Sequence, residues 1–181
     1  MNIKILFALL RNLGVKNFKK GEIILNEGDS NKVVFFIRKG LVRSYLINEK
    51  GEEITFQLFP ENQIFGNVHA ILFNDSSKFF YEAFEKTKVY YTDLQSFQEL
   101  TASYPDVLGT NRGGVGRQIL KQAFQRLDSF VFLSPEERYR QYIKDHPNII
   151  NRVPDKYIAN VLGITPVSLS RIRSRIAGKR K

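Results

Sequence analysis

The C-terminal part of the chain is constrained most by Gly163 and Pro166, which separate two short helical patterns. Gly163 can adopt the positive φ that ends a helix at no steric cost. Thr165 suits an N-cap, and Pro166 suits the first helical position, where a missing N–H costs nothing. Apolar residues at helical spacing mark one buried face on each side: Ile158, Ala159 and Leu162 before the glycine, and Leu169 and Ile172 after it. The pattern predicts a helix-turn-helix between Val153 and Arg175.

The second helix of this pair carries small polar and basic residues on its remaining faces. They are Ser168, Ser170, Arg171, Arg173, Ser174 and Arg175. An ordinary αα-hairpin is the alternative, but it gives no reason to place three arginines and no acid on one exposed helix. We therefore expect this helix to enter the major groove of DNA.

Basic residues are concentrated in the same part of the chain. The whole sequence has 28 Lys and Arg against 18 Asp and Glu, a net charge of +10. From Ser134 onward there are 11 basic and 4 acidic residues, a net of +7; residues 1–133 hold 17 and 14, a net of +3. A basic end on a nearly balanced body indicates a polyanionic partner. Nucleic acid fits better than an anionic membrane surface, because these basic residues lie on a patterned hairpin and not on a long amphipathic helix.

Several kinds of chemistry are excluded or unsupported. The chain has no cysteine, which removes disulfides, thiolate zinc sites and Cys-ligated iron–sulfur clusters. It shows no paired carboxylates, no nucleophile–base arrangement and no metal-ligand spacing, so we expect neither an enzyme nor a bound metal or cofactor. The apolar run Ile3–Leu10 is too short to span a membrane. We interpret residues 2–12 as an amphipathic helix ending near Gly14 and expect a cytoplasmic protein.

The stretch from Phe18 to Thr92 alternates short β-rich segments with turn residues. One short apolar strand is expected between two turns in residues 18–30. Further strands are expected over Val33–Ile37, Leu41–Ile47, Glu53–Phe59, Phe79–Phe84 and Lys88–Thr92, with a connection over Pro60–Gly66 and a short helix over Val68–Phe73. Short strands at close spacing predict an antiparallel roll or barrel.

Helical patterns follow. They cover Leu94–Tyr104, Gln118–Leu133 and a third helix to about His146 that begins at the capping box of Ser134, Pro135 and Glu137. The glycine-rich Asn111–Arg117 lacks the Gly-Lys-Ser/Thr ending of a P-loop, so we interpret it as a loose helix start.

The helix over residues 118–133 has two adjacent apolar faces. One carries Ile119, Ala123, Arg126 and Phe130, and the other carries Leu120, Phe124, Leu127 and Val131. Two apolar faces need two packing partners. The roll can supply one and a twin helix the other, which predicts a homodimer; the alternative is that both faces are buried within one subunit.

The order of these parts resembles the Crp/Fnr family of bacterial transcription regulators over nearly the whole chain. The residues that carry the resemblance are Phe18-Lys19-Lys20-Gly21-Glu22 with Glu27-Gly28-Asp29, the run Phe35–Arg43, and Phe65-Gly66. The resemblance implies an α+β fold with an N-terminal antiparallel β-roll, a long dimerisation helix and a C-terminal winged-helix-type helix-turn-helix. It assigns a sensor domain to residues 1–110, dimerisation to 111–133 and DNA binding to 134–181, and it makes RNA polymerase a candidate partner.

The family's ligand cassette identifies Gly66, Asn67, Ser77 and Lys78 as candidate ligand-binding residues. Members that bind cyclic AMP carry Gly-Glu after the Phe and an Arg-Ser pair further on; here Asn67 replaces the Glu and no arginine follows. An asparagine cannot accept two hydroxyl donors as a carboxylate does, and Lys78 lacks the bidentate fork of an arginine. We therefore expect another small molecule or no ligand in place of cyclic AMP. His69 and His146 are the available haem ligands, and a solvent-exposed or capping histidine is the commoner alternative.

On DNA, the resemblance makes Arg171 the base reader, through a bidentate contact to guanine. Pro166 and Val167 can offer only apolar contact to a thymine methyl group. Thr165, Ser168, Arg173, Arg175 and the Lys179–Lys181 tail suit phosphates. The expected function is a transcription regulator that binds a pseudo-palindromic site as a dimer. The alternative is a small-molecule sensor that signals through protein contacts.

Overall fold

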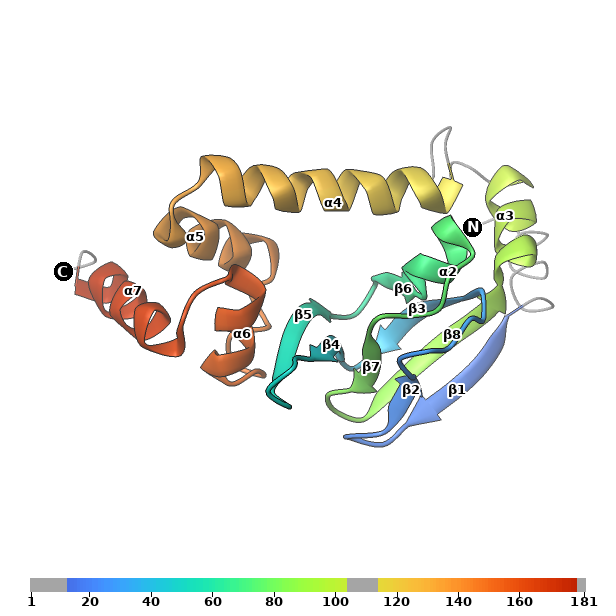
Figure 1. The fold of residues 1–181 in the computed structure, drawn as a ribbon, viewed down its shortest axis with the longest axis horizontal. Coiled ribbons are helices and arrows are strands. Elements are labelled where there is room, and N and C mark those ends of the chain that lie inside the picture. Colours follow the sequence, from blue (N-terminus) through green and yellow to red (C-terminus); the bar gives the residue numbers. More distant parts are fainter. Residues whose placement is uncertain (1–12, 104–113, 179–181) are drawn as a thin grey trace.

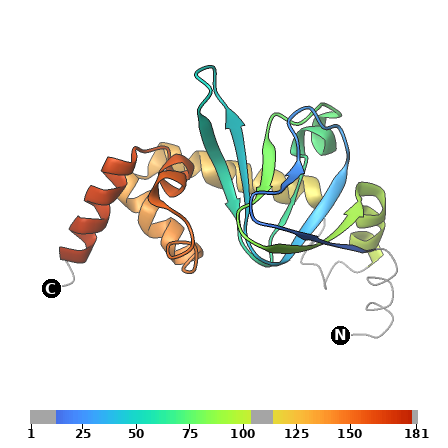
Figure 2. The ribbon, with the colours of Figure 1, turned by 90° about the horizontal axis from the view of Figure 1, so that it is seen from below.

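The computed structural model describes residues 13–103 and 114–178 (Figures 1 and 2). The helix expected over residues 2–12, residues 111–113 of the glycine-rich Asn111–Arg117 and the Lys179–Lys181 tail lie outside the described residues. Within the described ranges no helix is long and apolar enough to cross a membrane.

The N-terminal half is an antiparallel β-roll, as the sequence predicts. Its strands are β1 (Gly14–Phe18), β2 (Ile23–Leu25), β3 (Val33–Lys39), β4 (Val42–Ile47), β5 (Glu53–Phe59), β6 (Ile64–Gly66), β7 (Phe80–Ala83) and β8 (Thr87–Asp93), with helix α2 (Val68–Phe73) between β6 and β7. They form two four-stranded sheets, in the orders β1-β8-β3-β6 and β2-β7-β4-β5. The sheets enclose an aromatic core in which Phe35 stacks on Phe65 with ring centroids 4.9 Å apart.

Two of these strands were not predicted. We expected the N-terminal helix to end near Gly14 and predicted no strand there. Strand β1 begins at Gly14, which pairs with Tyr91 of β8. The connection expected over Pro60–Gly66 is wrong at its last three residues, which form β6 and pair with β3. Both strands are short and depend on a partner distant in sequence, so no local pattern marks them.

The C-terminal half consists of helices in the described residues. They are α3 (Leu94–Ser103), α4 (Gly114–Phe132), α5 (Pro135–Asp145), α6 (Asp155–Leu162) and α7 (Pro166–Gly178). The predicted capping box at the start of α5 is confirmed: Ser134 accepts from the Glu137 N–H and the Glu137 carboxylate accepts from the Ser134 N–H. The helix-turn-helix is confirmed in α6 and α7, and residues 134–178 contain no strand that would form a wing.

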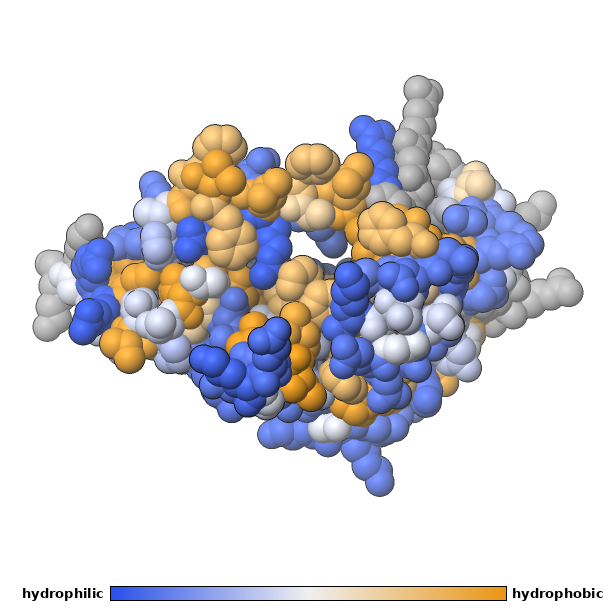
Figure 3. Space-filling view, in the orientation of Figure 1, coloured by the Kyte–Doolittle hydropathy of each residue, from blue (hydrophilic) through white to orange (hydrophobic). Residues whose placement is uncertain are grey.

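Helix α4 crosses the molecule above the roll and the C-terminal helices (Figure 1). Ile119 packs against the small cluster that contains Val34 and Phe97. The second apolar face points to solvent: Leu120, Phe124, Leu127 and Val131 are 54%, 54%, 56% and 66% exposed. We call these four residues the α4 stripe. In Figure 3 apolar surface runs along α4, and an open gap separates the middle of the helix from the body below it.

Gly40, between β3 and β4, provides a test of the roll's tight packing. It has φ 104°, and an added Cβ would lie 2.7 Å from the Thr87 Cα and 2.8 Å from the Lys86 carbonyl oxygen. Gly51 also has positive φ, at 78°, but its Cβ would meet open space. Gly51→Ala should cost about 1–2 kcal/mol of unfolding free energy from strain alone, and Gly40→Ala about 3 kcal/mol or more because the clash adds to it. Urea unfolding followed by circular dichroism measures both; equal losses would contradict this packing.

Candidate nucleic-acid interface and effector cavity

The turn between α6 and α7 has the geometry that its sequence predicts. Gly163 has φ 64° and ψ 37°, the left-handed conformation that closes a helix, and the N–H of Ile164 donates to the Ala159 carbonyl at 3.0 Å. Thr165 caps the next helix, because its Oγ1 accepts from the Ser168 N–H at 3.1 Å. The apolar side of α7 is buried through Leu169, Ile172 and Ile176. The opposite side of α7 is thereby held outward.

The outward side of α7 is accessible to a partner. Its exposed residues are Thr165, Pro166, Val167, Ser170, Arg171, Ser174 and Arg175. Arg171 makes no hydrogen bond or ion pair with any residue that the structure describes. Its guanidinium can therefore form a bidentate contact without first breaking an internal one.

Two other arginines of α7 are engaged within the chain. Arg173 bridges α7 to its neighbours: it forms an ion pair with Asp155 of α6, and its Nε donates to the Tyr139 hydroxyl at 3.0 Å. Arg175 pairs with Glu136 of α5 at 3.1 Å. The sequence predicted phosphate contacts for both arginines. It could not show these ion pairs, because the acidic partners lie 18 and 39 residues away along the chain.

The helix-turn-helix is docked firmly on the roll. Arg152, just before α6, donates to Glu61 at 2.8 and 2.9 Å and to Glu85 at 2.6 Å. Burial would raise the pKa of Glu61, but the hydrogen bonds from Arg152 and from the Gly40 N–H lower it to about 2. The Asn160 side chain of α6 also accepts from the Thr55 N–H of β5 at 3.2 Å.

A buried arginine joins the same two parts, and sequence reasoning missed its role. Arg43 of β4 is 3% exposed and forms ion pairs with Glu53 at 2.6 Å and Glu82 at 2.7 Å. Its guanidinium lies 4.1 Å from the ring centre of Tyr45 and 4.8 Å from that of Tyr157 on α6. The first helix of the pair therefore packs on a charge that the roll itself neutralises.

The four candidate ligand residues lie close together, but the polar side chains of Asn67 and Ser77 are used internally. Asn67 is fully buried; its Oδ1 caps α2 at the Ala70 N–H, and its Nδ2 donates to the Asp29 carbonyl at 2.6 Å. The Ser77 N–H donates to the same Asp29 carbonyl, and the Ser77 hydroxyl donates to Phe79 at 2.8 Å. Lys78 is exposed, and Gly66 approaches β3 so closely that an added Cβ would lie 2.6 Å from the Val33 carbonyl oxygen.

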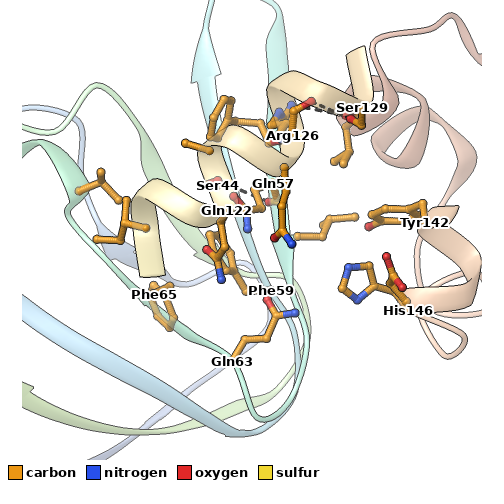
Figure 4. A pocket seen from close by; sticks show the side chains of 18 of the residues that line it. Ser44, Gln57, Phe59, Gln63, Phe65, Gln122, Arg126, Ser129, Tyr142 and His146 are labelled. Atoms are coloured by element: carbon orange, nitrogen blue, oxygen red, sulfur yellow. Dashed lines mark hydrogen bonds between the residues drawn. The ribbon is translucent and has the colours of Figure 1, made fainter. Parts of the chain in front are cut away.

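A cavity of about 1040 Å³ lies beside these residues, between the roll, α4 and the C-terminal helices. Gly66 lines it, whereas Asn67, Ser77 and Lys78 do not. Figure 4 shows its polar lining, which sequence reasoning did not identify: Ser44, Gln57, Gln63, Gln122, Arg126 and Tyr142. These residues come from β4, β5, the loop before β6, α4 and α5, so only the fold brings them together.

The histidines and one tyrosine differ in environment. His69 lies half-buried beside the rings of Phe73 and Phe79. His146 ends α5 and lines the cavity, and burial lowers its pKa. The Tyr142 hydroxyl is buried without a hydrogen-bond partner among the described residues, and burial raises its pKa. In the described ranges no group of three His, Asp or Glu side chains is arranged to hold a metal ion.

Comparison with known proteins identifies this architecture. Residues 15–104 match the family model of the cyclic nucleotide-binding domain. A global nitrogen regulator of Synechococcus elongatus is 24% identical over 92% of this chain and 83% of its own length. Electron transport regulator A of Shewanella oneidensis is 29% identical over 88% of this chain and 67% of its own length.

Solved structures show the same fold. FixK2 of Bradyrhizobium japonicum superposes with a TM-score of 0.73 at 18% identity, over 92% of this chain and 85% of that one. A Crp/Fnr-family transcriptional regulator of Thermus thermophilus gives a TM-score of 0.65 at 17% identity, over 92% and 87%. The β-roll followed by a helix pair is therefore an architecture shared with a known transcriptional regulator. Over most of its length the chain is therefore similar to transcription regulators, and its fold is shared with a member of the Crp/Fnr family that its sequence resembles.

The ion pair between Arg152 and Glu61 makes the free energy of unfolding depend on pH at acidic values. The pKa of Glu61 is lowered from 4.5 to about 2, so its contribution is present above pH 4.5 and is lost as the pH falls towards 2. Because the Glu61 side chain is 32% exposed, solvent screening reduces the effect, and Glu61→Gln should cost about 1–2 kcal/mol at pH 7 and less near pH 2.

Unfolding free energies of wild type, Glu61→Gln and the exposed control Glu49→Gln across pH 2–7 measure this contribution. The control should follow wild type at every pH. A Glu61→Gln variant as stable as wild type at pH 7 would contradict the account.

Proposed function

We propose that this chain is a sequence-specific transcription regulator that binds a pseudo-palindromic DNA site as a homodimer. The observation that carries the proposal is helix α7: it is capped at Thr165 and buried on its apolar side, and it presents the unpaired Arg171 outward. We assign sensing to residues 1–110, dimerisation to 111–133 and DNA binding to 134–181.

Base recognition is assigned to the exposed side of α7. Arg171 would contact a guanine through its two terminal nitrogens, a contact that discriminates by about 1–3 kcal/mol. Val167 is 61% exposed and, with Pro166, offers apolar contact to a thymine methyl group. A site with few charged readers at these two positions should tolerate A·T pairs there.

Phosphate contacts are assigned to the edges of the same helix. Thr165 and Ser168, whose hydroxyls lie 3.0 Å apart, suit one phosphate. Arg175 is exposed beyond its ion pair and suits another. Arg173 is also a candidate, but its bonds to Asp155 and Tyr139 support a second role, which is to brace α7 against α5 and α6.

The dimer interface is assigned to the α4 stripe and, with it, to residues 118–133. The four side chains recur at i, i+4, i+7 and i+11, so they form one continuous apolar line on the helix. An exposed apolar line of this length is costly in water and marks a protein contact. A second copy of the same helix matches it in length and character, as in a two-stranded helical interface.

The 1040 Å³ cavity is proposed as the site of a small effector. Its amide and hydroxyl lining supports a ligand with several hydrogen-bonding groups. Cyclic AMP is not proposed, because Asn67 is committed to capping α2 and no arginine stands in the cassette. RNA polymerase is proposed as a protein partner on the resemblance to the family alone.

A second function remains open, in which the chain senses a small molecule and signals through protein contacts made by α7. The cavity favours sensing, but the unpaired Arg171 favours DNA. Affinity for DNA that falls steeply with salt separates the two, because phosphate neutralisation releases counterions whereas a protein contact of this size does not.

Arg171→Ala tests the base reader. Selection from a random duplex library should show loss of preference at one base pair per half-site, with a cost of about 1–3 kcal/mol on the preferred site. Arg140→Ala, which removes an exposed arginine of α5, should keep the wild-type preference. If Arg171→Ala selects the same sequence as wild type, the assignment of Arg171 as base reader is wrong.

Leu127→Glu tests the dimer. A carboxylate in the centre of the α4 stripe would be buried on association. The dissociation constant of the dimer should therefore increase at least 100-fold, which corresponds to about 2.7 kcal/mol. Gln125→Glu makes the same charge change off the stripe and should leave the dimer intact. Sedimentation equilibrium measures both, and a wild-type chain that is monomeric at micromolar concentration would exclude the proposed interface.

A further inference from the structure

Three side chains from α4 and α5 surround the turn of the helix-turn-helix. Arg126 of α4 donates through Nη1 to the Phe56 carbonyl at 2.7 Å and through Nη2 to the Val161 carbonyl at 3.4 Å. Arg138 of α5 donates through Nε to the Leu162 carbonyl at 3.2 Å. Val161 and Leu162 are the last two residues of α6, so both arginines bind the end of that helix just before the turn.

These carbonyls are available because they end a helix. The last carbonyls of an α-helix have no intrahelical partner and carry the negative end of the helix dipole. Guanidinium groups suit them in both charge and hydrogen bonding. Arg138 also donates to the Leu133 carbonyl at 2.8 Å, close to the end of α4, so one side chain joins the ends of two helices.

Phe130 of α4 fills the space between the two arginines. Its ring centre lies 5.5 Å from the Arg126 guanidinium carbon and 4.9 Å from that of Arg138. The ring also packs on the turn itself: a Cβ on Gly163 would lie 2.7 Å from a Phe130 ring carbon. Gly163 is thus required for its positive φ and also for the approach of this ring. We call Arg126, Phe130 and Arg138 the turn clasp.

Arg126 acts in the clasp through hydrogen bonds and ring contact and not through an ion pair with a described residue. Arg126 is partly buried, and it has no ion pair with a described residue. Its position is maintained by two backbone carbonyls and by the Phe56 ring, whose centre lies 4.4 Å from the guanidinium carbon. Its two acceptors belong to the roll and to α6. Arg126 therefore sets how α4 sits relative to both.

We infer that the turn clasp holds helix α7 at a defined angle to α4 and thereby selects the spacing between the two DNA half-sites. The inference rests on the proposed function, because it requires two copies joined along α4. The ion pairs of Arg152 join α6 to the roll, whereas the clasp joins the turn directly to the helix that would lie on the dimer axis. Arg126, Phe130 and Arg138 are positioning residues in this account, and Arg171 reads the base.

The required precision follows from DNA geometry. Half-sites are read about one helical turn apart, 34–36 Å, and one extra base pair moves a half-site by roughly 3.4 Å and rotates it by about 34°. A rigid pair of reading helices cannot follow that change, whereas a loosened pair can. The clasp should therefore affect spacing preference and leave the base preference of each half-site unchanged.

The experiment compares binding to the duplex selected by the wild-type protein with binding to duplexes whose centre is one base pair longer or shorter. Wild type should lose at least tenfold in affinity on both altered duplexes. Arg126→Met and Arg138→Met, which keep an unbranched aliphatic stem but remove the donors, should lose less than threefold relative to their own best duplex. Arg126→Lys, which keeps the positive charge but loses the rigid fork of the guanidinium, should lie between. Arg140→Met, on the same helix as Arg138 but outside the clasp, should behave as wild type.

The outcomes are distinguishable. Variants that weaken equally on all spacings, or that keep the wild-type tenfold loss, overturn the inference and leave the proposed function intact. A wild type without any spacing preference overturns both. If a methionine variant does not fold, the Arg126→Lys result decides alone, and wild-type spacing selectivity in that variant overturns the inference.

Discussion

The exposed apolar side of α4 is the constraint on which the rest of the structure depends. This helix has 19 residues, and its described side chains include none that is buried. It touches the roll through Ile119 and Arg126 and the helix-turn-helix through Arg126 and Phe130, and it passes over an open cavity between these contacts. A helix held so sparsely has little tertiary packing to stabilise it, and most helical stability in proteins comes from such packing. A second copy along the α4 stripe would supply what one subunit lacks.

The C-terminal helices, in contrast, are fixed to the roll. One hydrophobic cluster contains Leu41 and Leu58 of the roll together with Ile158 of α6 and Leu169 of α7. Arg152 and Arg43 add ion pairs and ring contacts at its border. Because the same cavity is lined by the roll, by α4 and by the end of α6, a ligand there would contact every part that determines where α7 points. In the proposed function, this arrangement would couple a ligand bound beside the roll to the orientation of α7.

Local signals in the sequence predicted much of this structure. Ser134 with Glu137, and Gly163 with Thr165, act within a few residues of themselves, so their caps were predictable and are confirmed. The features that were missed depend on partners distant in the chain. Strand β6 exists only because β3 pairs with it, and Arg173 is bound by an aspartate that a sequence pattern does not connect to it. Asn67 was interpreted through the family's ligand cassette, and its capping role needs the position of α2.

The stoichiometry of the DNA complex tests the central claim most directly. Sedimentation of the chain with its selected duplex should give two chains per duplex carrying two half-sites. A duplex with one half-site should bind at least 100-fold more weakly, because the second α7 then has no site. One chain per duplex, with equal affinity for one and two half-sites, would contradict the account.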